Sequence, residues 1–267
     1  EISWDEALDI ITEKLKKIQK TNPRGILTTS SVVVAGGGMA VNNAFINAAF
    51  GAPSYWVSGA GPHCGNAEHL FGGLLHGAWC KWPDPLHCNY ILNFGTPAGA
   101  GAYYTVSGMT RMMADARARG LKQVVIEPYM GMAGEKADEW VPIRPGTDAS
   151  MALAMVNVLL NELGVFDAEY LKEHTNGPYL IGPDGYYVRD SETKKPLVWD
   201  AHEKRAKAFD DPTVKDFTLE GEYDVQGVKA HTAFTLLREH VKKYTPESAA
   251  ELTTVPAATI RRLAKEF

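Results

Sequence analysis

Residues 89–127 read NYILNFGTPAGAGAYYTVSGMTRMMADARARGLKQVVIE and contain the clearest structural pattern in the chain. The apolar run Asn89–Phe94 predicts a buried strand, and a glycine-rich turn follows it. A helix is expected from about Tyr103 to Arg119, and a second apolar strand over Val124–Ile126. Strand, helix and strand in this order predict a βαβ unit, whose strands pair in parallel through a right-handed crossover.

The upstream segment, residues 1–58, continues this pattern toward the N-terminus. It is expected to form a helix, strand, helix, strand series, as at the edge of a parallel sheet. The expected elements are a helix capped by Ser3, a strand over Ile26–Thr29, a helix over Met39–Phe50 and a strand over Ser54–Val57.

The downstream segment adds further elements of the same kind. A loop over Ser58–Gly65 leads into a helix expected over Asn66–His76. Trp140–Ile143 predicts a short strand, and Asp148 opens a nearly all-apolar helix over Met151–Leu160. We therefore predict an α/β fold with an open, mostly parallel, Rossmann-like sheet and flanking helices.

After Glu173 the sequence becomes irregular and charged, and turn-forming residues interrupt it. Turn-forming residues at Pro183–Gly185 and at Gln226–Gly227, flanked by alternating residues, predict two hairpins. We expect an irregular, hairpin-containing insertion at about residues 176–230. Two or three helices should finish the chain, over Ala233–Tyr244, Pro246–Glu251 and Pro256–Phe267.

Composition narrows the classes of function. The 267 residues, 45% of them hydrophobic, are enough to bury a substantial core. The net charge of -5 comes from 27 basic and 32 acidic residues, mixed along the chain without a basic block. We therefore expect no nucleic-acid partner. No run reaches the roughly 20 apolar residues that span a bilayer, so direct membrane insertion is not expected either.

Three cysteines are too few, and odd in number, for a disulfide framework. Cys64 lies on the loop that precedes a helix, whereas Cys80 and Cys88 stand among apolar and aromatic residues, as buried thiols do. A zinc site at Cys64 is conceivable, and so is a nucleophilic thiol with a neighbouring histidine as base. The further zinc ligands would come from His63, Glu68 and His69, and the base would be His63.

Three further places suit a nucleotide, and each also has a purely structural explanation. The turn Gly95–Gly101 offers N–H groups to an anion, but it lacks the GxGxxG spacing and equally fits a plain tight turn. Glu127 ends a strand where carboxylates accept from ribose hydroxyls, although a solvated carboxylate needs no ligand. Asp148 follows the turn Arg144–Thr147, and helix capping accounts for it without a ligand.

Read in order, four segments resemble the molybdenum and tungsten oxidoreductases of the dimethyl sulfoxide reductase family. ISWDEALDIITEKLKKI, residues 2–18, resembles the segment that follows the family's iron–sulfur region. HCGNAEH, residues 63–69, falls where the family places its protein ligand to the metal. CNYILNFGTPAG, residues 88–99, resembles the family's first nucleotide-binding strand and turn. VVIEPYMGMAGEKADEWVPIRPGTDASMALAMVNVLL, residues 124–160, is the strongest match and resembles the run that binds a guanosine end.

The resemblance implies a metal centre at the first of these loops. Cys64 would be the metal ligand, because a soft thiolate suits molybdenum or tungsten beside dithiolene sulfurs. His63 would be a candidate for proton transfer, and so the candidate catalytic residue. Several family members carry their proton-handling histidine after the ligand, where this chain has Gly65.

The resemblance also implies a nucleotide site. Gly95, Thr96 and Pro97 would lie against the phosphates of the dinucleotide, and Glu127 against a ribose. The residues implied to contact the guanine are Gly146, Thr147 and Asp148. This sequence departs from the family at Glu127, where aspartate is usual, and at Tyr129–Met130, where arginine and threonine are usual. The second departure puts a phosphate contact from that loop in doubt.

The implied cofactor is bis-molybdopterin guanine dinucleotide with molybdenum or tungsten. The resemblance further implies a fragment: the [4Fe-4S] cluster would belong to an N-terminal region, and C-terminal domains would follow. Residues 1–58 would form a partial lobe, and residues 59–267 a more self-sufficient dinucleotide-binding lobe. The compartment stays open between prokaryotic cytoplasm and periplasm.

The implied activity is transfer of an oxygen atom, a hydride or electrons at the metal, with a small-molecule substrate. An iron–sulfur electron-transfer subunit is the expected protein partner. Two alternatives remain: a non-redox hydratase or transhydroxylase with the same cofactor, and a nucleotide-binding module without catalysis. Within the redox class, the loop at residues 63–69 and the hairpins favour anaerobic enzymes acting on sulfur compounds or aromatic acyl-CoA.

Overall fold

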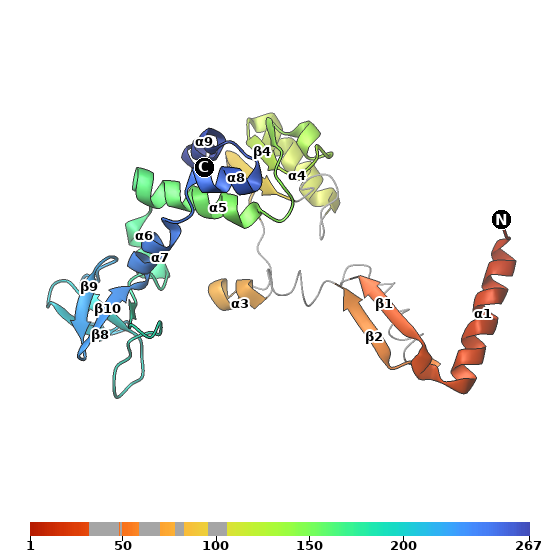
Figure 1. The fold of residues 1–267 in the computed structure, drawn as a ribbon, viewed down its shortest axis with the longest axis horizontal. Coiled ribbons are helices and arrows are strands. Elements are labelled where there is room, and N and C mark those ends of the chain that lie inside the picture. Colours follow the sequence, from red (N-terminus) through yellow and green to blue (C-terminus); the bar gives the residue numbers. More distant parts are fainter. Residues whose placement is uncertain (32–47, 49, 59–69, 78–82, 96–105) are drawn as a thin grey trace. The chain divides into compact units, whose positions relative to one another are not determined.

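The computed structural model describes residues 1–31, 48, 50–58, 70–77, 83–95 and 106–267 (Figure 1). Two compact units are present. The first is built on residues 1–87, and the second takes in residues 110–267 together with the strand at 90–94. The predicted lobe boundary at residue 58 stays a prediction. Among the described helices, none combines the length and the apolar character that a membrane crossing requires.

The first unit contains the helix and the two strands expected near the N-terminus. Helix α1, Trp4–Thr21, begins at Ser3, whose hydroxyl accepts a hydrogen bond from the Glu6 N–H at 3.2 Å. Strands β1, Leu27–Ser31, and β2, Ser54–Ser58, pair in parallel. The predicted helix over Met39–Phe50 lies almost wholly outside the described residues. The described part of the helix expected over Asn66–His76 is helix α3, Phe71–His76.

The second unit is organised around a three-stranded parallel sheet of order β3-β4-β5. The strands are β3, Tyr90–Phe94, β4, Lys122–Ile126, and β5, Glu139–Val141. Helix α4, Val106–Arg119, connects the first two strands, so the predicted βαβ unit is confirmed. The molecule is thus a mixed α/β protein with a parallel sheet and flanking helices.

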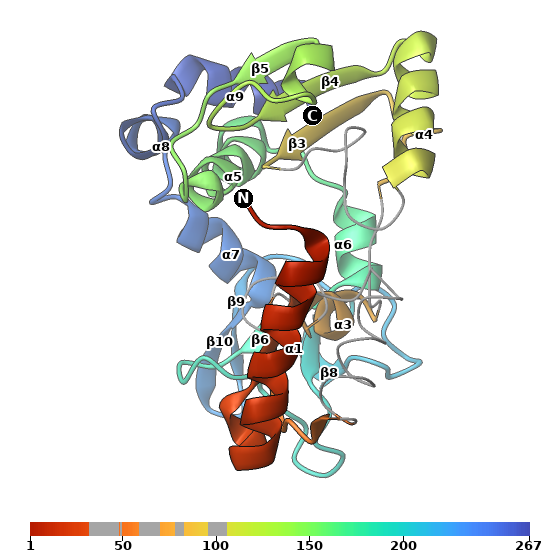
Figure 2. The ribbon, with the colours of Figure 1, turned by 90° about the vertical axis from the view of Figure 1, so that its right-hand side faces the viewer.

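Helices cover both faces of this sheet. Figures 1 and 2 show α4 on one side, and α5, α8 and α9 on the other. The covering helices are α5, Asp148–Asn157, α8, Pro246–Thr253, and α9, Ala257–Glu266. The side chains of Val124, Val125 and Ile126 are all 0% exposed, which explains why β4 is a continuous apolar run and not an alternating one. The main core joins β4 to Met151, Ile260 and Leu263.

Helix α9 is attached to the amino ends of all three strands. The carboxylate of Glu266 accepts hydrogen bonds from the Tyr90 hydroxyl and from the Lys122 ammonium group, both at 2.9 Å. Arg262 pairs with Glu266 and, at 2.5 Å, with Glu139. Tyr90, Lys122 and Glu139 are the first residues of β3, β4 and β5. These donors lower the pKa of Glu266 to about 2.

The insertion is richer in strands than the sequence indicates. A π-helical turn, Val158–Leu163, and helix α6, Ala168–His174, lead into it. Its strands are β6, Leu180–Ile181, β7, Leu197–Asp200, β8, Arg205–Ala208, β9, Glu222–Val225, and β10, Val228–Thr232. They form a β7-β8 hairpin and a sheet of order β6-β10-β9. Helix α7, Ala233–Val241, then returns the chain to α8.

Both predicted hairpins are confirmed. Gln226 and Gly227 join β9 to β10 with φ values of 52° and 80°, as a two-residue type I′ turn requires. Around Pro183–Gly185, Ile181 forms an antiparallel bridge with Tyr187. The three predicted C-terminal helices are confirmed as α7, α8 and α9, with small differences at their ends.

Candidate nucleotide site

A cavity of about 480 Å³ lies at the carboxyl edge of the parallel sheet. Gly95 follows β3 and Glu127 follows β4, so two of the predicted cofactor-binding residues meet here. The remaining lining residues belong to the loop between β4 and β5, and they are Pro128, Tyr129, Gly131, Met132, Ala133 and Glu135. Carboxyl edges of parallel sheets are the usual position of ligand sites in α/β proteins.

Gly95 occupies the left-handed region, with φ 56°. Its N–H donates to the carbonyl of Ile126 at 3.0 Å, so this group is not free to bind an anion. No described atom lies within 4 Å of the point where a Cβ would stand. Glycine therefore supplies a backbone conformation and an open side, and it does not supply a donor.

Glu127 is held by its backbone on two sides. Its N–H donates to the Val141 carbonyl at 3.2 Å, and its carbonyl accepts from Trp140 Nε1 at 3.0 Å. The residue is only 8% exposed, and its carboxylate has no hydrogen bond or ion pair within the described residues. A Cβ at Gly131 would lie 3.5 Å from Glu127 Oε2, so glycine keeps the space beside this carboxylate open. The arrangement leaves the carboxylate at the cavity, free to accept a hydrogen bond from a ligand.

Asn93 is a residue of this edge that the sequence analysis missed. Asn93 pairs with Val125 across the strands, so its side chain leaves the same face of the sheet as Gly95 and Glu127. It is 4% exposed, and Nδ2 has no hydrogen-bond partner in the described part of the chain. The observation that points to it is an asparagine inside the apolar strand YILNF.

The predicted guanine-binding residues lie after β5 and do not line this cavity. Gly146 is exposed with φ 77°, and Thr147 and Asp148 are half-buried. The prediction that Asp148 caps α5 was wrong by one position. Thr147 occupies the N-cap without a capping hydrogen bond, because its hydroxyl donates to the Arg144 carbonyl at 2.7 Å. Asp148 is the first helical residue, where a carboxylate still interacts favourably with the helix dipole.

The remaining predicted site residues fall outside the described residues: His63, Cys64, Thr96 and Pro97. Within the described parts, no group of three or more histidine, cysteine, aspartate or glutamate side chains is arranged to hold a metal ion. The described cavity has two carboxylates, Glu127 and Glu135, and no cationic or thiol side chain among its lining residues. These two hydrogen-bond acceptors therefore suit the hydroxyl and amine groups of a ligand better than phosphates or a soft metal.

Comparison with known proteins identifies the family of the chain. The model of the molybdopterin oxidoreductase family matches residues 1–169. A sulfite dehydrogenase subunit of Allochromatium vinosum is 29% identical over 100% of this chain and 28% of its own length. The alpha subunit of the perchlorate reductase of Dechloromonas aromatica is 27% identical over 99% of this chain and 33% of its own.

Among solved structures, acetylene hydratase from Pelobacter acetylenicus resembles the chain with a TM-score of 0.50 at 25% identity. That likeness covers 98% of this chain and 28% of the hydratase. The chain thus spans a third or less of the length of the relatives it matches. On the family match and these relatives, the chain belongs to the molybdopterin oxidoreductases of the dimethyl sulfoxide reductase family.

Proposed function

We propose that this chain binds the guanosine end of molybdopterin guanine dinucleotide at the carboxyl edge of the β3-β4-β5 sheet. The observation that carries the proposal is the carboxylate of Glu127, a residue 8% exposed, which lines the cavity without a partner in the described residues. A carboxylate that opens on a cavity can accept hydrogen bonds from a ligand bound there. The vicinal hydroxyls of a ribose would supply the donors.

The charges of the cavity suggest how the parts of the nucleotide are divided among the residues. Two carboxylates and no cation among the described lining residues disfavour a phosphate in the cavity itself. We therefore assign the ribose to Glu127 and the phosphates to the side of Thr96 and Pro97, with Gly95 allowing close approach. Asn93 Nδ2 is a further donor on the same face of the sheet.

The guanine is assigned to Gly146, Thr147 and Asp148. A carboxylate accepts well from the two adjacent N–H groups on the edge of a guanine, and Asp148 is half-buried at the start of α5. The three-stranded sheet would then be part of a larger, open Rossmann-like sheet. Its parallel order β3-β4-β5 supports this extension.

The proposed metal centre rests on the sequence alone, because His63 and Cys64 lie outside the described residues. Cys64 would ligate molybdenum or tungsten, and His63 would carry a proton to or from the substrate. When bound, the metal–pterin group would supply two-electron redox chemistry. A [4Fe-4S] cluster and a separate electron-transfer subunit complete the proposed enzyme. Two of the relatives are named as subunits of their enzymes, which supports a partner protein here.

The proposed reaction is transfer of an oxygen atom, a hydride or electrons to or from a small molecule. The likeness to acetylene hydratase supports a second candidate, hydration without net electron transfer. Redox-dye turnover separates the two. An oxidoreductase oxidises reduced viologen, or reduces an oxidised dye, in step with its substrate, whereas a hydratase converts its substrate while the dye stays unchanged.

The cofactor assignment is tested on the natural full-length protein purified without oxygen. Molybdenum and tungsten are measured by elemental mass spectrometry, and guanosine monophosphate is measured after acid hydrolysis. We expect the metal and the guanine nucleotide to be present together. Metal without guanine nucleotide would refute the dinucleotide form, and the absence of both would refute the proposal.

Variants then test the residues. Glu127→Ala and Asp148→Asn should each lower the guanine nucleotide content, while Cys64→Ser should lower the metal content more than the nucleotide content. Glu251→Gln is the matched control, because Glu251 is exposed on α8 and has no partner in the described structure. If Glu127→Ala retains as much nucleotide as Glu251→Gln, Glu127 has no part in the site.

A further inference from the structure

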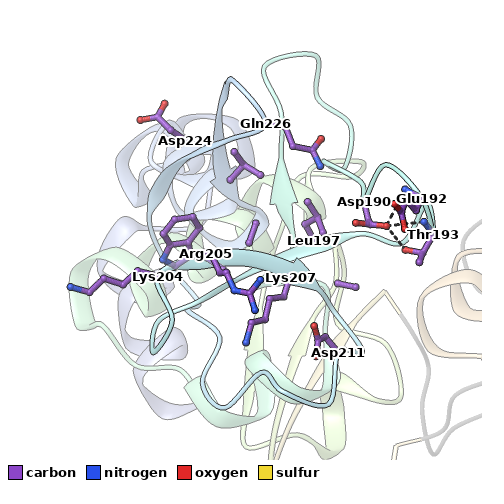
Figure 3. Close-up of a pocket in the computed structure, with 14 residues that line it drawn as sticks. Asp190, Glu192, Thr193, Leu197, Lys204, Arg205, Lys207, Asp211, Asp224 and Gln226 are labelled. Carbon is purple, nitrogen blue, oxygen red and sulfur yellow. Dashed lines mark hydrogen bonds between the residues drawn. The ribbon is translucent and has the colours of Figure 1, made fainter.

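The insertion contains a larger cavity, of about 620 Å³, that the proposed function does not use. Every residue of β8 lines it, together with Asp224 and Val225 of β9 and residues of β7 (Figure 3). Its floor is apolar, with Leu197 at 4% and Val225 at 5% exposure. Beside the floor, the rings of Trp199 and Tyr223 stack at 4.3 Å and join the β7-β8 hairpin to the β6-β10-β9 sheet.

Two strand edges are open at this cavity. In the described structure, β8 pairs only with β7, and β9 pairs only with β10. The hydrogen bond from the Phe209 N–H to the Pro196 carbonyl makes Lys207 and Val198 the next hydrogen-bonded pair of the β7-β8 ladder. The following hydrogen-bonded pair is Arg205 with Asp200, so Ala206, which lies between Lys207 and Arg205, directs its N–H and carbonyl away from β7.

The same reasoning applies to β9. The Thr232 N–H donates to the Gly221 carbonyl, so Tyr223 and Val225 are the residues of β9 that exchange hydrogen bonds with β10. Asp224 lies between them and directs its N–H and carbonyl away from β10. Ala206 and Asp224 both line the cavity. Unpaired backbone groups of two edge strands thus border one apolar floor, which is the requirement for strand addition.

The charge around the cavity is negative. Four lining carboxylates, those of Asp190, Glu192, Asp211 and Asp224, form no ion pair in the described structure. Hydrogen bonds from Thr193 and Thr213 hold the pKa of Asp190 and the pKa of Asp211 below the usual range, so both stay ionised.

The lining cations do not balance these charges. Arg205 is paired with Glu203 at 2.8 Å, and Lys207 with Asp200 at 2.7 Å. Lys204, the third lining cation, forms no ion pair in the described structure, so one free positive charge faces four free carboxylates (Figure 3). The uncompensated charge at the cavity is therefore acidic and favours a basic occupant.

We infer that this cavity binds an extended segment of another protein, in which basic residues alternate with apolar ones. The segment adds as a strand to the open edges at Ala206 and Asp224. Its apolar side chains face the floor of Leu197 and Val225, and its basic side chains face the rim carboxylates, because alternate residues of a strand point to opposite sides. The insertion is, on this inference, a docking module for a partner protein.

The test uses the 267-residue chain and a short fluorescein-labelled peptide of alternating lysine and valine. Binding is followed by fluorescence anisotropy at low salt. Two peptides serve as controls: alternating glutamate and valine, and the lysine peptide with N-methyl groups on every second residue. We expect binding of the lysine peptide alone, and weaker binding as salt is raised. Equal binding of the N-methylated peptide would refute strand addition, since it lacks the backbone donors.

Three variants locate the site. Ala206→Pro removes an outward N–H without removing a hydrogen bond to β7, and Asp224→Lys reverses a rim charge. Each should weaken peptide binding about tenfold, as the loss of one or two hydrogen bonds or an ion pair does. Glu251→Lys carries the same charge change on α8 and should leave binding unchanged. Circular dichroism verifies folding of each variant. Unchanged binding by folded Asp224→Lys, or no binding of the lysine peptide to the wild-type chain, would overturn the inference.

Discussion

Replacing Gly95 with alanine tests whether the turn at Gly95 only connects two elements or also lies against a bound ligand. An L-residue at φ 56° costs about 1–2 kcal/mol, and no described atom within 4 Å of the new Cβ adds a clash. We therefore expect Gly95→Ala to lower the free energy of unfolding in urea by about 1–2 kcal/mol. Gly164→Ala is the matched control, because Gly164 has φ 65° and an equally open Cβ position, and it lies outside the cavity.

The two variants should differ in their guanine nucleotide content. The new methyl group of Gly95→Ala projects into the side left open at the cavity, where the proposed nucleotide approaches. The content measured in the full-length protein should fall by about tenfold or more for Gly95→Ala and stay unchanged for Gly164→Ala. If both variants lose the same stability and both keep the nucleotide, Gly95 serves only as a turn and the close-approach argument is refuted.

Three further predictions concern stability. Met151→Ala, in the fully buried core against β4, should lower the free energy of unfolding in urea by about 2–5 kcal/mol, and a loss under about 1 kcal/mol would contradict the packing. Thr254→Gly should raise it by about 1 kcal/mol, because this β-branched residue has φ 67° at the end of α8; a lower midpoint would contradict this. Glu266 has a pKa of about 2, below its usual 4.5, so its contribution is present above pH 4.5 and is lost as the pH falls toward 2. Glu266→Gln should flatten the dependence of stability on pH over that window, and an unchanged slope in acid titrations would show that the network contributes nothing.

Much of the fold could be predicted because local patterns and tertiary packing agree in it. The apolar runs before Gly95 and before Glu127 identify β3 and β4, and the rules of parallel connection then place both residues at one edge. Gln226–Gly227 identified a hairpin because a type I′ turn needs two residues with positive φ.

The parts that were missed lack such local information. The β7-β8 hairpin turns through residues 201–204 without glycine or proline, and Lys204 takes the positive φ, so nothing in the sequence marks the turn. The sequence shows Asn93 only as one residue of an apolar strand, and its role becomes visible from its amide group, which is buried without a partner in the described structure. The loop residues that line the cavity, such as Tyr129 and Met132, depend on how the chain folds back between β4 and β5, which no periodicity encodes. The proposed metal loop around Cys64 stays a prediction.

The contacts of α9 make the two ends of the parallel sheet different, because they involve only the amino ends of the strands. Arg262 and Glu266 connect the first residues of all three strands, so the sheet is fastened at its amino end. The carboxyl end is held by backbone hydrogen bonds, from the Gly95 N–H to Ile126 and from the Glu127 N–H to Val141, which do not depend on the side chains of the loops. Substitutions in the loops at that end can therefore accumulate without loss of the fold. A sheet fastened in this way is suited to divergence, because ligand preference can change while the framework that presents it is inherited intact.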